Sequence, residues 1–499
     1  MAINQILNDS EAPKIVKTDI GSKDGQNKCP QCGATDISVN AKTGKLRCNF
    51  CRHEFEPEKI QGMETDITKI KGEIMGSGTQ DIGENTQNVM TLKCSSCGAE
   101  VIIDTSESTT ARCHWCRNIL SVNQQIPNGA IPDVVLPFNL TKAEAKEQIE
   151  NFVGKRKFFA HPKFRKEFTT DNIMGVYFPY MVVDINSHAR FSGRGECTVK
   201  EYIKKHVDSN GRESSQTYYD ADLYEIERDF DLTIEGLTVE SSSDKLNKQS
   251  NKTNNIINSI MPFDVENSVK YNANYLKGYT SERRDVNIDE LRPLIDMQSK
   301  DIAKVAANEV SEEYDRGINW KSEQLEMKGK QWKTAYLPVW LYSYQQKKGK
   351  KDSTVHYVAV NARTKETMGS VPIYWPKLFA ISFGLAIFVF LTQKKVPVEY
   401  EMTFLVIGII FFVVMYLKYR NLDARHYHET ETKKKIFNLK KEDSFIEHRK
   451  DLSNSKMIGA NNATGVRLKD ISDAWAKKFE DYYEELKASG KDYYKNFKL

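Results

Sequence analysis

The chain has 499 residues, with 72 basic and 68 acidic side chains and a formal net charge of +4. This length allows two to four domains with at least one sizeable core. The net charge is too small to indicate nucleic-acid binding by the chain as a whole, so any such binding must be local. A mean hydropathy of −0.57 is typical of a largely soluble protein, against which two apolar runs near the C-terminus stand out.

Eight of the nine cysteines belong to a motif that occurs twice, C-x2-C-x15-C-x2-C. A tetrahedral Zn²⁺ takes four thiolates at about 2.3 Å, and each C-x2-C turn, or knuckle, supplies two of them. Residues 1–26 are expected to form a flexible N-terminus, followed by a first ribbon at 27–56 and a second at 91–122. Each ribbon predicts one closed structural zinc site, with ligands Cys29, Cys32, Cys48 and Cys51 in the first and Cys94, Cys97, Cys113 and Cys116 in the second.

The two copies also agree outside the ligands. Gly33 and Gly98 follow the first knuckle of each copy, where glycine permits a positive φ. Short strands are expected at 37–39 and 101–103. The pattern resembles a pair of TFIIB-type zinc ribbons. The alternative is two disulfides per copy, but the first 14 residues lack the apolar stretch of a signal peptide, which favours a reducing compartment and zinc.

A flexible linker is expected at 57–90, where glycines are frequent and aliphatic residues few. An α+β cytoplasmic domain is expected at 133–372. It would begin with a strand at 134–138 and a helix at 142–153 that Thr141 caps, and a second helix at 303–314 and a strand at 354–360 would follow. The stretch 241–258 is nearly all Ser, Asn, Lys and Gln, and is interpreted as a polar insertion.

Two segments of this domain resemble one another, Y-F-P-Y-M-V-V at 177–183 and Y-L-P-V-W-L-Y at 336–342. They suggest a degenerate internal duplication. Proline in an apolar, β-favouring run is expected at a bulge, a strand start or an edge. Both prolines are therefore predicted to turn a strand at the same structural point.

The apolar runs at 378–392 and 402–417 contain no charged residue. Each would be roughly 22 to 24 Å of helix, shorter than a hydrocarbon slab of about 30 Å, so flanking aromatic residues would have to complete the span. We predict a two-helix transmembrane hairpin at 373–417, and a buried apolar hairpin is the alternative. Only Lys394 and Lys395 lie in the connecting loop, so the positive-inside rule predicts a multi-pass cell-membrane protein with both termini in the cytoplasm.

The tail at 418–499 is basic and is predicted to be helical and cytoplasmic. Ile471, Trp475 and Phe479 recur every four residues, and Tyr482, Tyr483 and Leu486 continue the stripe along one helix face. Such a face usually packs on its own protein, but it can also bind a partner.

No P-loop, G-x-S-x-G, H-E-x-x-H or strand-linked G-x-G-x-x-G motif occurs in the sequence. Cys197 is the one cysteine outside the ribbons, and a buried structural role for it is far commoner than a nucleophilic one. Four thiolates leave a zinc ion no open position. The sequence therefore predicts two structural Zn²⁺ ions and no enzyme, and an unrecognised catalytic site within 133–370 is the alternative.

Beyond the ribbons, the segments at 134–153, 175–184, 336–340 and 360–365 resemble blocks of a family of bacterial membrane-anchored double zinc-ribbon proteins, often labelled primosomal or helicase-like. The resemblance covers roughly residues 29 to 420. It implies a link to envelope-stress systems of the PspA or SPFH type, whose peripheral or integral membrane proteins would be the partners. The polar insertion and the long charged tail depart from that family.

These observations favour a membrane-anchored adaptor that recruits protein partners to the cytoplasmic membrane face and contacts the lipid bilayer. The alternative is nucleic-acid binding at the membrane, because Arg47, Arg52, Arg112 and Arg117 lie on the second knuckles near Phe50 and Trp115. The oligomeric state and the joint action of the two ribbons are left open by the sequence.

Overall fold

A computed structural model describes residues 132–453, with gaps at 208–212, 243–256, 349–351, 393–402 and 421–425 and at residues 272, 277 and 283. Of the first 131 residues it describes 14–16, 29–34, 36–40, 45–56, 63–79, 89–94, 100–104, 110–113, 119–121 and 125–126. Most of the polar insertion, the ligands Cys97 and Cys116, and the apolar stripe at 471–486 lie outside the described residues.

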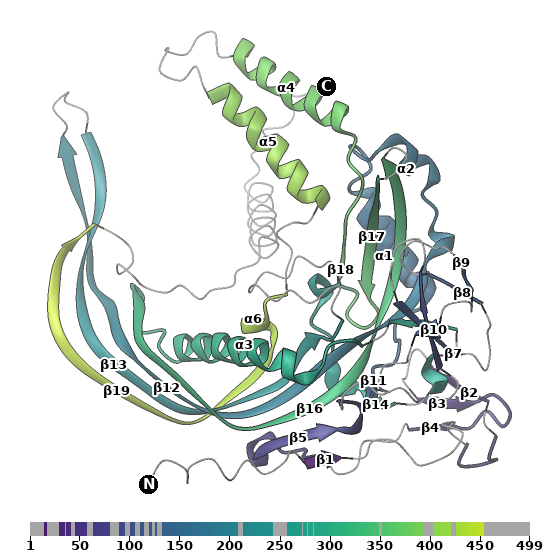
Figure 1. Cartoon of the computed structure of the whole chain (residues 1–499). Helices are drawn as coiled ribbons and strands as arrows, with labels where there is room; N and C mark the ends of the chain where they lie inside the picture. Colours follow the sequence, from purple (N-terminus) through teal and green to yellow (C-terminus); the bar gives the residue numbers. More distant parts are fainter. Residues whose placement is uncertain are drawn as a thin grey trace, which may run out of the picture. The chain divides into compact units, whose positions relative to one another are not determined.

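Four long antiparallel strands make up most of the main sheet, in the order β19–β13–β12–β16. Figure 1 shows these strands curving together, with helix α3 on their concave side. The bounds are β12 (Met174–Val207), β13 (Glu213–Glu240), β16 (Gly317–Lys348), β19 (Lys433–Leu452) and α3 (Ile288–Glu309).

Apolar residues at alternate positions of these strands pack against the apolar face of α3, and together they form one core. Phe230 and Leu232 of β13 are buried on alternate positions, and Leu291, Ile295 and Ile302 of α3 pack in the same cluster. This match of a period-two face with a helical stripe explains why the helix lies on the sheet.

Shorter strands extend the same sheet along its flanks. Among the described residues it contains fourteen strands, with β5, β11 and β17 next to β16 and with β15 next to β12. The remaining bounds are β1 (Lys14–Val16), β5 (Gly72–Gly76), β6 (Val89–Lys93), β7 (Glu100–Asp104), β10 (Gln125–Ile126), β11 (Val134–Val135), β14 (Val269–Lys270), β15 (Thr280–Glu282), β17 (Asp352–Asn361) and β18 (Thr367–Gly369).

The first predicted helix is confirmed as α1 (Lys142–Gly154), and Thr141 caps it as expected. The strand predicted at 354–360 is confirmed as part of β17. The helix expected at 303–314 is instead the C-terminal part of α3, which begins fifteen residues earlier at Ile288. The other helices of the region are α2 (Pro162–Glu167), α4 (Trp375–Thr392), α5 (Thr403–Arg420) and α6 (His428–Glu431).

The two similar proline segments pair with each other. Tyr177 lies opposite Pro338 and Pro179 opposite Tyr336 in the β12–β16 register. Neither proline ends its strand, so the prediction that they turn a strand is wrong. On its other edge β12 pairs with β15 at Tyr177 and with β13 from Tyr180, so Pro179 lies where the partner strand changes. A missing N–H is tolerated there because no ladder bond is required.

The prediction of separate small ribbon domains and a transmembrane hairpin is wrong as a description of the fold. Two strands of the second ribbon, β6 and β7, belong to the main sheet, because β7 pairs with β15 and β6 pairs with β7. The segment expected to be a flexible linker includes β5, which pairs in parallel with β16. The fold of the described residues is therefore mixed α+β, with one large curled sheet, one small three-stranded sheet near the N-terminus and one separate pair of short strands from the second ribbon.

The apolar runs do form two helices, α4 and α5, but the predicted spans and the multi-pass membrane localisation are wrong. Within the described part of the chain, neither of these helices nor any other has the length and apolarity needed to cross a bilayer. The flanking residues expected to complete the spans instead attach the helices to the protein. Tyr419 is buried and its hydroxyl accepts a hydrogen bond from the Phe159 N–H, and the Lys377 ammonium donates to the Phe158 carbonyl.

The tail beyond the second apolar run was predicted to be helical. Its described part is mainly β19, a 20-residue strand that pairs with β13 and carries mostly exposed side chains. The sequence K-K-K-I-F-N-L-K-K-E-D-S-F-I has no clear alternation. Its extended conformation is explained by the pairing with β13, because strand propensity depends on neighbours.

Candidate metal centre

The first cysteine motif folds around a three-stranded sheet of its own. Strands β2 (Ile37–Val39), β3 (Leu46–Cys48) and β4 (Glu54–Phe55) are antiparallel neighbours. One knuckle precedes β2 and the other follows β3, so the two thiol pairs face one another. Cys29 and Cys48 are buried, whereas Cys32 is exposed.

Both knuckles close in the same way. The Gly33 N–H donates to the Cys29 carbonyl and the Arg52 N–H donates to the Cys48 carbonyl, each at 2.8 Å. Gly33 has φ of +71°, as the sequence predicted, and Arg52 has φ of +60°. A residue with a side chain is destabilised by about 1 to 2 kcal/mol in this left-handed backbone conformation. The second knuckle is therefore strained at Arg52, whereas the first has glycine at the equivalent position.

The four sulfur atoms have the arrangement that a tetrahedral metal ion requires. All of them lie within 4.8 Å of one another, and Cys29–Cys51 and Cys32–Cys48 are each 3.5 Å apart. Tetrahedral Zn–S bonds of about 2.3 Å place sulfurs roughly 3.8 Å apart. The residues therefore fit a four-cysteine site for a metal ion such as zinc.

Backbone hydrogen bonds help to lower the pKa of two of the four thiols, those of Cys29 and Cys48. The backbone N–H of Cys51 is directed at the Cys48 sulfur, 3.5 Å away, and lowers the pKa of that thiol to about 7. The backbone hydrogen bond with His53 lowers the pKa of Cys51, but burial and the neighbouring thiols raise it by more. The net result is a pKa raised to about 12. A metal ion must displace the remaining protons, so its affinity falls as the pH falls.

A polar network that the sequence reasoning missed holds the second knuckle against the sheet. The Asn49 side-chain amide donates from its Nδ2 to the Asp36 carboxylate at 3.0 Å, and its Oδ1 accepts a hydrogen bond from the Ser38 hydroxyl at 2.9 Å. The Asn49 N–H also bonds the Asp36 carbonyl. Asp and Asn commonly brace turns, but the spacing of these two along the chain carries no signal that they would meet.

The second cysteine motif is described only in part. Cys94 follows β6 and Cys113 follows β8 (Thr110–Arg112), which pairs with β9 (Ile119–Ser121). Both cysteines are buried. Cys97 and Cys116 lie outside the described residues, so the four-cysteine group of the first motif is the one that the described part of the chain brings together. None of the seven described cysteines forms a disulfide.

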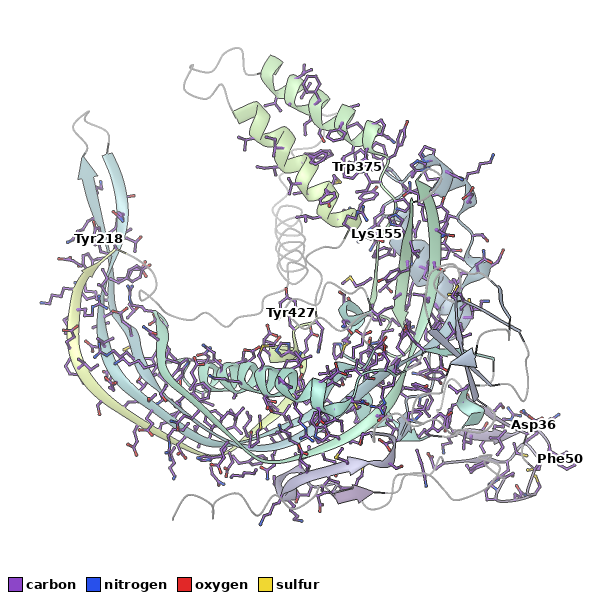
Figure 2. The ribbon with its side chains drawn as sticks, in the orientation of Figure 1. Asp36, Phe50, Lys155, Tyr218, Trp375 and Tyr427 are labelled. Carbon is purple, nitrogen blue, oxygen red and sulfur yellow. The ribbon has the colours of Figure 1, made fainter. Side chains whose placement is uncertain are left out.

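The tip of the second knuckle exposes an aromatic ring. Phe50 is 82% exposed, and Figure 2 shows it at the outer end of the small sheet near Asp36. Arg47 and Arg52 are exposed on the same ribbon. Of the predicted basic and aromatic partners from the second motif, Trp115, Arg117 and the Arg112 side chain lie outside the described residues.

The thiol of Cys197 and the imidazole of His188, which are near one another in sequence, contact different groups. The Cys197 thiol contacts the Asp222 carbonyl, and burial raises its pKa. His188 instead contacts the carboxylate of Asp231 at 3.0 Å and that of Asp229 at 3.5 Å. A raised pKa keeps a thiol protonated, which is the opposite of an activated nucleophile.

A cavity of about 500 Å³ lies where β12, β13 and β16 meet the loop at 261–268. Its acidic groups are largely occupied by neighbours: Asp184 pairs with Lys333 at 2.7 Å and Asp264 with Arg363 at 2.6 Å. This volume is within the usual range for small-molecule sites, but the paired charges do not define a reaction.

Comparison with known proteins gives one distant relationship. No protein-family model matches the chain, and no solved structure matches it. The chain is similar to the uncharacterised protein YdjG of Bacillus subtilis (strain 168), with 24% identity over 375 residues, which are 74% of this chain and 96% of that protein. The likeness shows distant homology and assigns no family and no activity.

Proposed function

We propose that this chain is a non-catalytic adaptor that binds a protein partner through its metal-stabilised ribbon. The observation that carries the proposal is the exposure of Phe50, whose side chain is 82% exposed. Phe50 lies at the tip of a knuckle, next to the group of four cysteines. Four thiolates fill the coordination of a zinc ion, which suits a structural and not a catalytic role.

An aromatic ring on a rigid support is the type of residue that dominates protein interfaces. Burying a ring removes about 150 to 250 Å² of surface from water, and such anchors account for most of the binding energy. The knuckle fixes the Phe50 backbone in advance, so binding would lose little conformational entropy.

The charge of the ribbon favours a protein over a nucleic acid. Residues 27–56 contain five basic and three acidic side chains. One of the basic residues, Lys45, already pairs with Glu56 at 2.8 Å. Strong phosphate binding requires several unpaired cations, whereas a mixed rim around an aromatic anchor is typical of protein interfaces.

We further propose that the second motif holds its own zinc ion, with Cys94, Cys97, Cys113 and Cys116 as ligands. The identical spacing of the two motifs and the burial of Cys94 and Cys113 support this assignment. The resemblance found in the sequence supports partners of PspA or SPFH type from an envelope-stress system.

The test is quantitative affinity purification of the full chain after cross-linking in cells. We expect the enriched partner to be lost with Phe50→Ala and retained with Phe445→Ala, a matched control because Phe445 is 57% exposed on β19. Cys29→Ser should also lose the partner, because the knuckle loses its metal. Equal recovery with wild type and Phe50→Ala would reject the proposal.

Nucleic-acid binding is the second candidate, because Arg47 and Arg52 are exposed near Phe50. Phosphate contacts make affinity fall steeply with salt, and the aromatic ring could stack on a base. Titration of the full chain with single-stranded DNA and RNA at several salt concentrations separates the candidates. A steep slope that Arg47→Ala reduces would support nucleic acid, and a flat slope would exclude it.

A further inference from the structure

The helical hairpin α4–α5 carries a large apolar surface that the described part of the chain leaves exposed. The exposed apolar side chains lie on both helices, and Lys418 at the C-terminal end of α5 is the one exposed charged side chain among the described side chains of the two helices. The large apolar ones are Phe379, Phe383, Ile387 and Phe388 on α4 and Val406, Ile409, Ile410, Val413 and Val414 on α5, each between 43% and 67% exposed. Water-exposed apolar patches of this size on a folded protein mark binding surfaces.

The contact between the two helices uses only a narrow stripe of each. On α4 the buried positions are Leu378, Ser382 and Ala386, spaced four residues apart. A Cβ added at Gly408 of α5 would lie 3.0 Å from the Ala386 Cβ, so the helices approach closely there. The opposite faces are equally apolar and have no described partner.

The base of the hairpin is fixed to the rest of the protein, so the apolar faces are presented on a rigid support. The Arg156 guanidinium donates to the Lys418 carbonyl at 2.9 Å, and the Val371 N–H donates to the Tyr419 carbonyl. Within the hairpin, Trp375 of α4, labelled in Figure 2, lies beside Phe412 of α5 with the ring centroids 6.2 Å apart and the rings tilted by 35°.

We propose that this hairpin is the interface between two copies of the chain, whose four helices pack as a bundle about a two-fold axis. The exposed apolar side chains of α4 and α5 offer no charge that a different partner could complement. An apolar face is, however, complementary to the same face of a second copy in a two-fold arrangement. The nine exposed side chains present on the order of 800 Å², which is the area that each partner contributes to a standard stable interface.

The shape of α4 suits close packing of a second helix. Gly384 lies between the exposed rings of Phe383 and Phe388, and a Cβ added there would meet nothing within 4 Å. The rings form a ridge and the glycine a gap, and ridges of one helix pack into grooves of another at about 8 to 10 Å between axes. A dimer would bring two ribbons into one assembly, independently of whether Phe50 binds a partner.

The test is the mass of the full, zinc-loaded chain by light scattering and sedimentation over a wide concentration range. We expect a species of about twice the 57.3 kDa chain mass. The double variant Phe383→Lys, Ile409→Lys should be monomeric, with dimer affinity reduced roughly 100-fold or more. Ile203→Lys is the matched control and should remain dimeric, because Ile203 is 68% exposed on β12, away from the hairpin.

A second double variant, Phe388→Lys with Val413→Lys, repeats the test if the first double variant does not fold. Thermal unfolding and zinc content show whether each variant is folded. A wild-type chain that stays monomeric at every concentration overturns the proposal. So does a dimer that neither double variant disrupts. If the wild-type chain is recovered only together with detergent or phospholipid vesicles, and is then monomeric, the proposal is also overturned. The apolar surface of the hairpin would then bind lipid.

Discussion

At the scale of single residues, Arg52 and Gly33 occupy equivalent left-handed positions in two knuckles that are otherwise alike. Gly33 has no atom within 4 Å of an added Cβ, so its requirement for glycine comes from the backbone alone. Arg52 adopts the same conformation with a side chain. The strain is tolerated because the Arg52 N–H bonds the carbonyl of Cys48, one of the four cysteines of the candidate metal centre.

Metal analysis of single cysteine variants tests the assignment of both motifs. We expect two zinc ions per wild-type chain, one in Cys48→Ser and one in Cys113→Ser, because removing one of four thiolates from a closed site abolishes structural binding. Elemental analysis of purified, reduced protein measures the stoichiometry. Cys197→Ser is the control and should retain both ions, and a Cys113→Ser variant with the wild-type content would exclude the second site.

At the scale of elements, the capping box of α1 joins local sequence to the tertiary fold. The Glu144 carboxylate accepts hydrogen bonds from the Thr141 N–H at 3.0 Å and from its hydroxyl at 2.8 Å. Lys365, from the turn after β17, also reaches Glu144 at 3.3 Å. The backbone hydrogen bond from Thr141 is the main reason that the pKa of Glu144 is lowered to about 2.

This pKa shift predicts a pH-dependent contribution to stability. The unfolded chain titrates Glu144 near its ordinary pKa of about 4.3, so the stabilisation is complete above that pH and is lost as the pH falls toward about 2. Glu144→Gln keeps the hydrogen-bonding geometry but not the charge. We expect wild type to be the more stable at neutral pH and the difference to shrink through this window.

Urea unfolding at a series of pH values measures this difference. Glu147→Gln is the control, because Glu147 lies one turn away on the same helix and should give a smaller change. A difference between wild type and Glu144→Gln that stayed constant from neutral pH to about pH 2 would show that the charge of Glu144 contributes nothing.

Local sequence signals were sufficient for some elements and insufficient for others. The C-x2-C spacing predicted the first four-cysteine group, and Thr141 predicted the start of α1, because each signal is complete within a few residues. The strand β19 was missed because its conformation depends on β13, about 200 residues earlier. The apolar runs of α4 and α5 predicted helices correctly and membrane spans wrongly, because the flanking residues that would lengthen the spans bind the protein.

At the scale of the whole molecule, two buried ionic networks fasten the edge strand β19 to the sheet. Arg228 of β13 is fully buried and reaches Asp443 of β19 at 2.5 Å and Glu313 at 2.9 Å. Glu196 of β12 is also fully buried and accepts hydrogen bonds from Arg316 and Arg449. An edge strand whose side chains are mostly exposed gains little from apolar burial, so these charges are expected to contribute strongly to its attachment.

Glu196 is therefore a position at which a substitution should strongly destabilise the fold. Its carboxylate is 3.2 Å from the Arg316 Nε and 2.9 Å from the Arg449 Nη1, and Arg316 is only 2% exposed. In Glu196→Ala the carboxylate is absent, so the buried Arg316 guanidinium loses this ion-pair partner. Breaking a buried ion pair on one side costs about 3 to 5 kcal/mol, so we expect a loss of that size in the free energy of unfolding.

Glu225→Ala is the matched control, because Glu225 pairs with Arg194 at 3.5 Å on the same sheet but both side chains are about half exposed. An exposed pair contributes at most about 1 kcal/mol, so this variant should unfold close to wild type. Urea denaturation gives the two free energies, and amide hydrogen exchange locates the loss. Faster exchange at 433–452 in Glu196→Ala is expected if the network holds β19, because Arg449 then loses its buried carboxylate. Equal stability of the two variants would contradict the assignment.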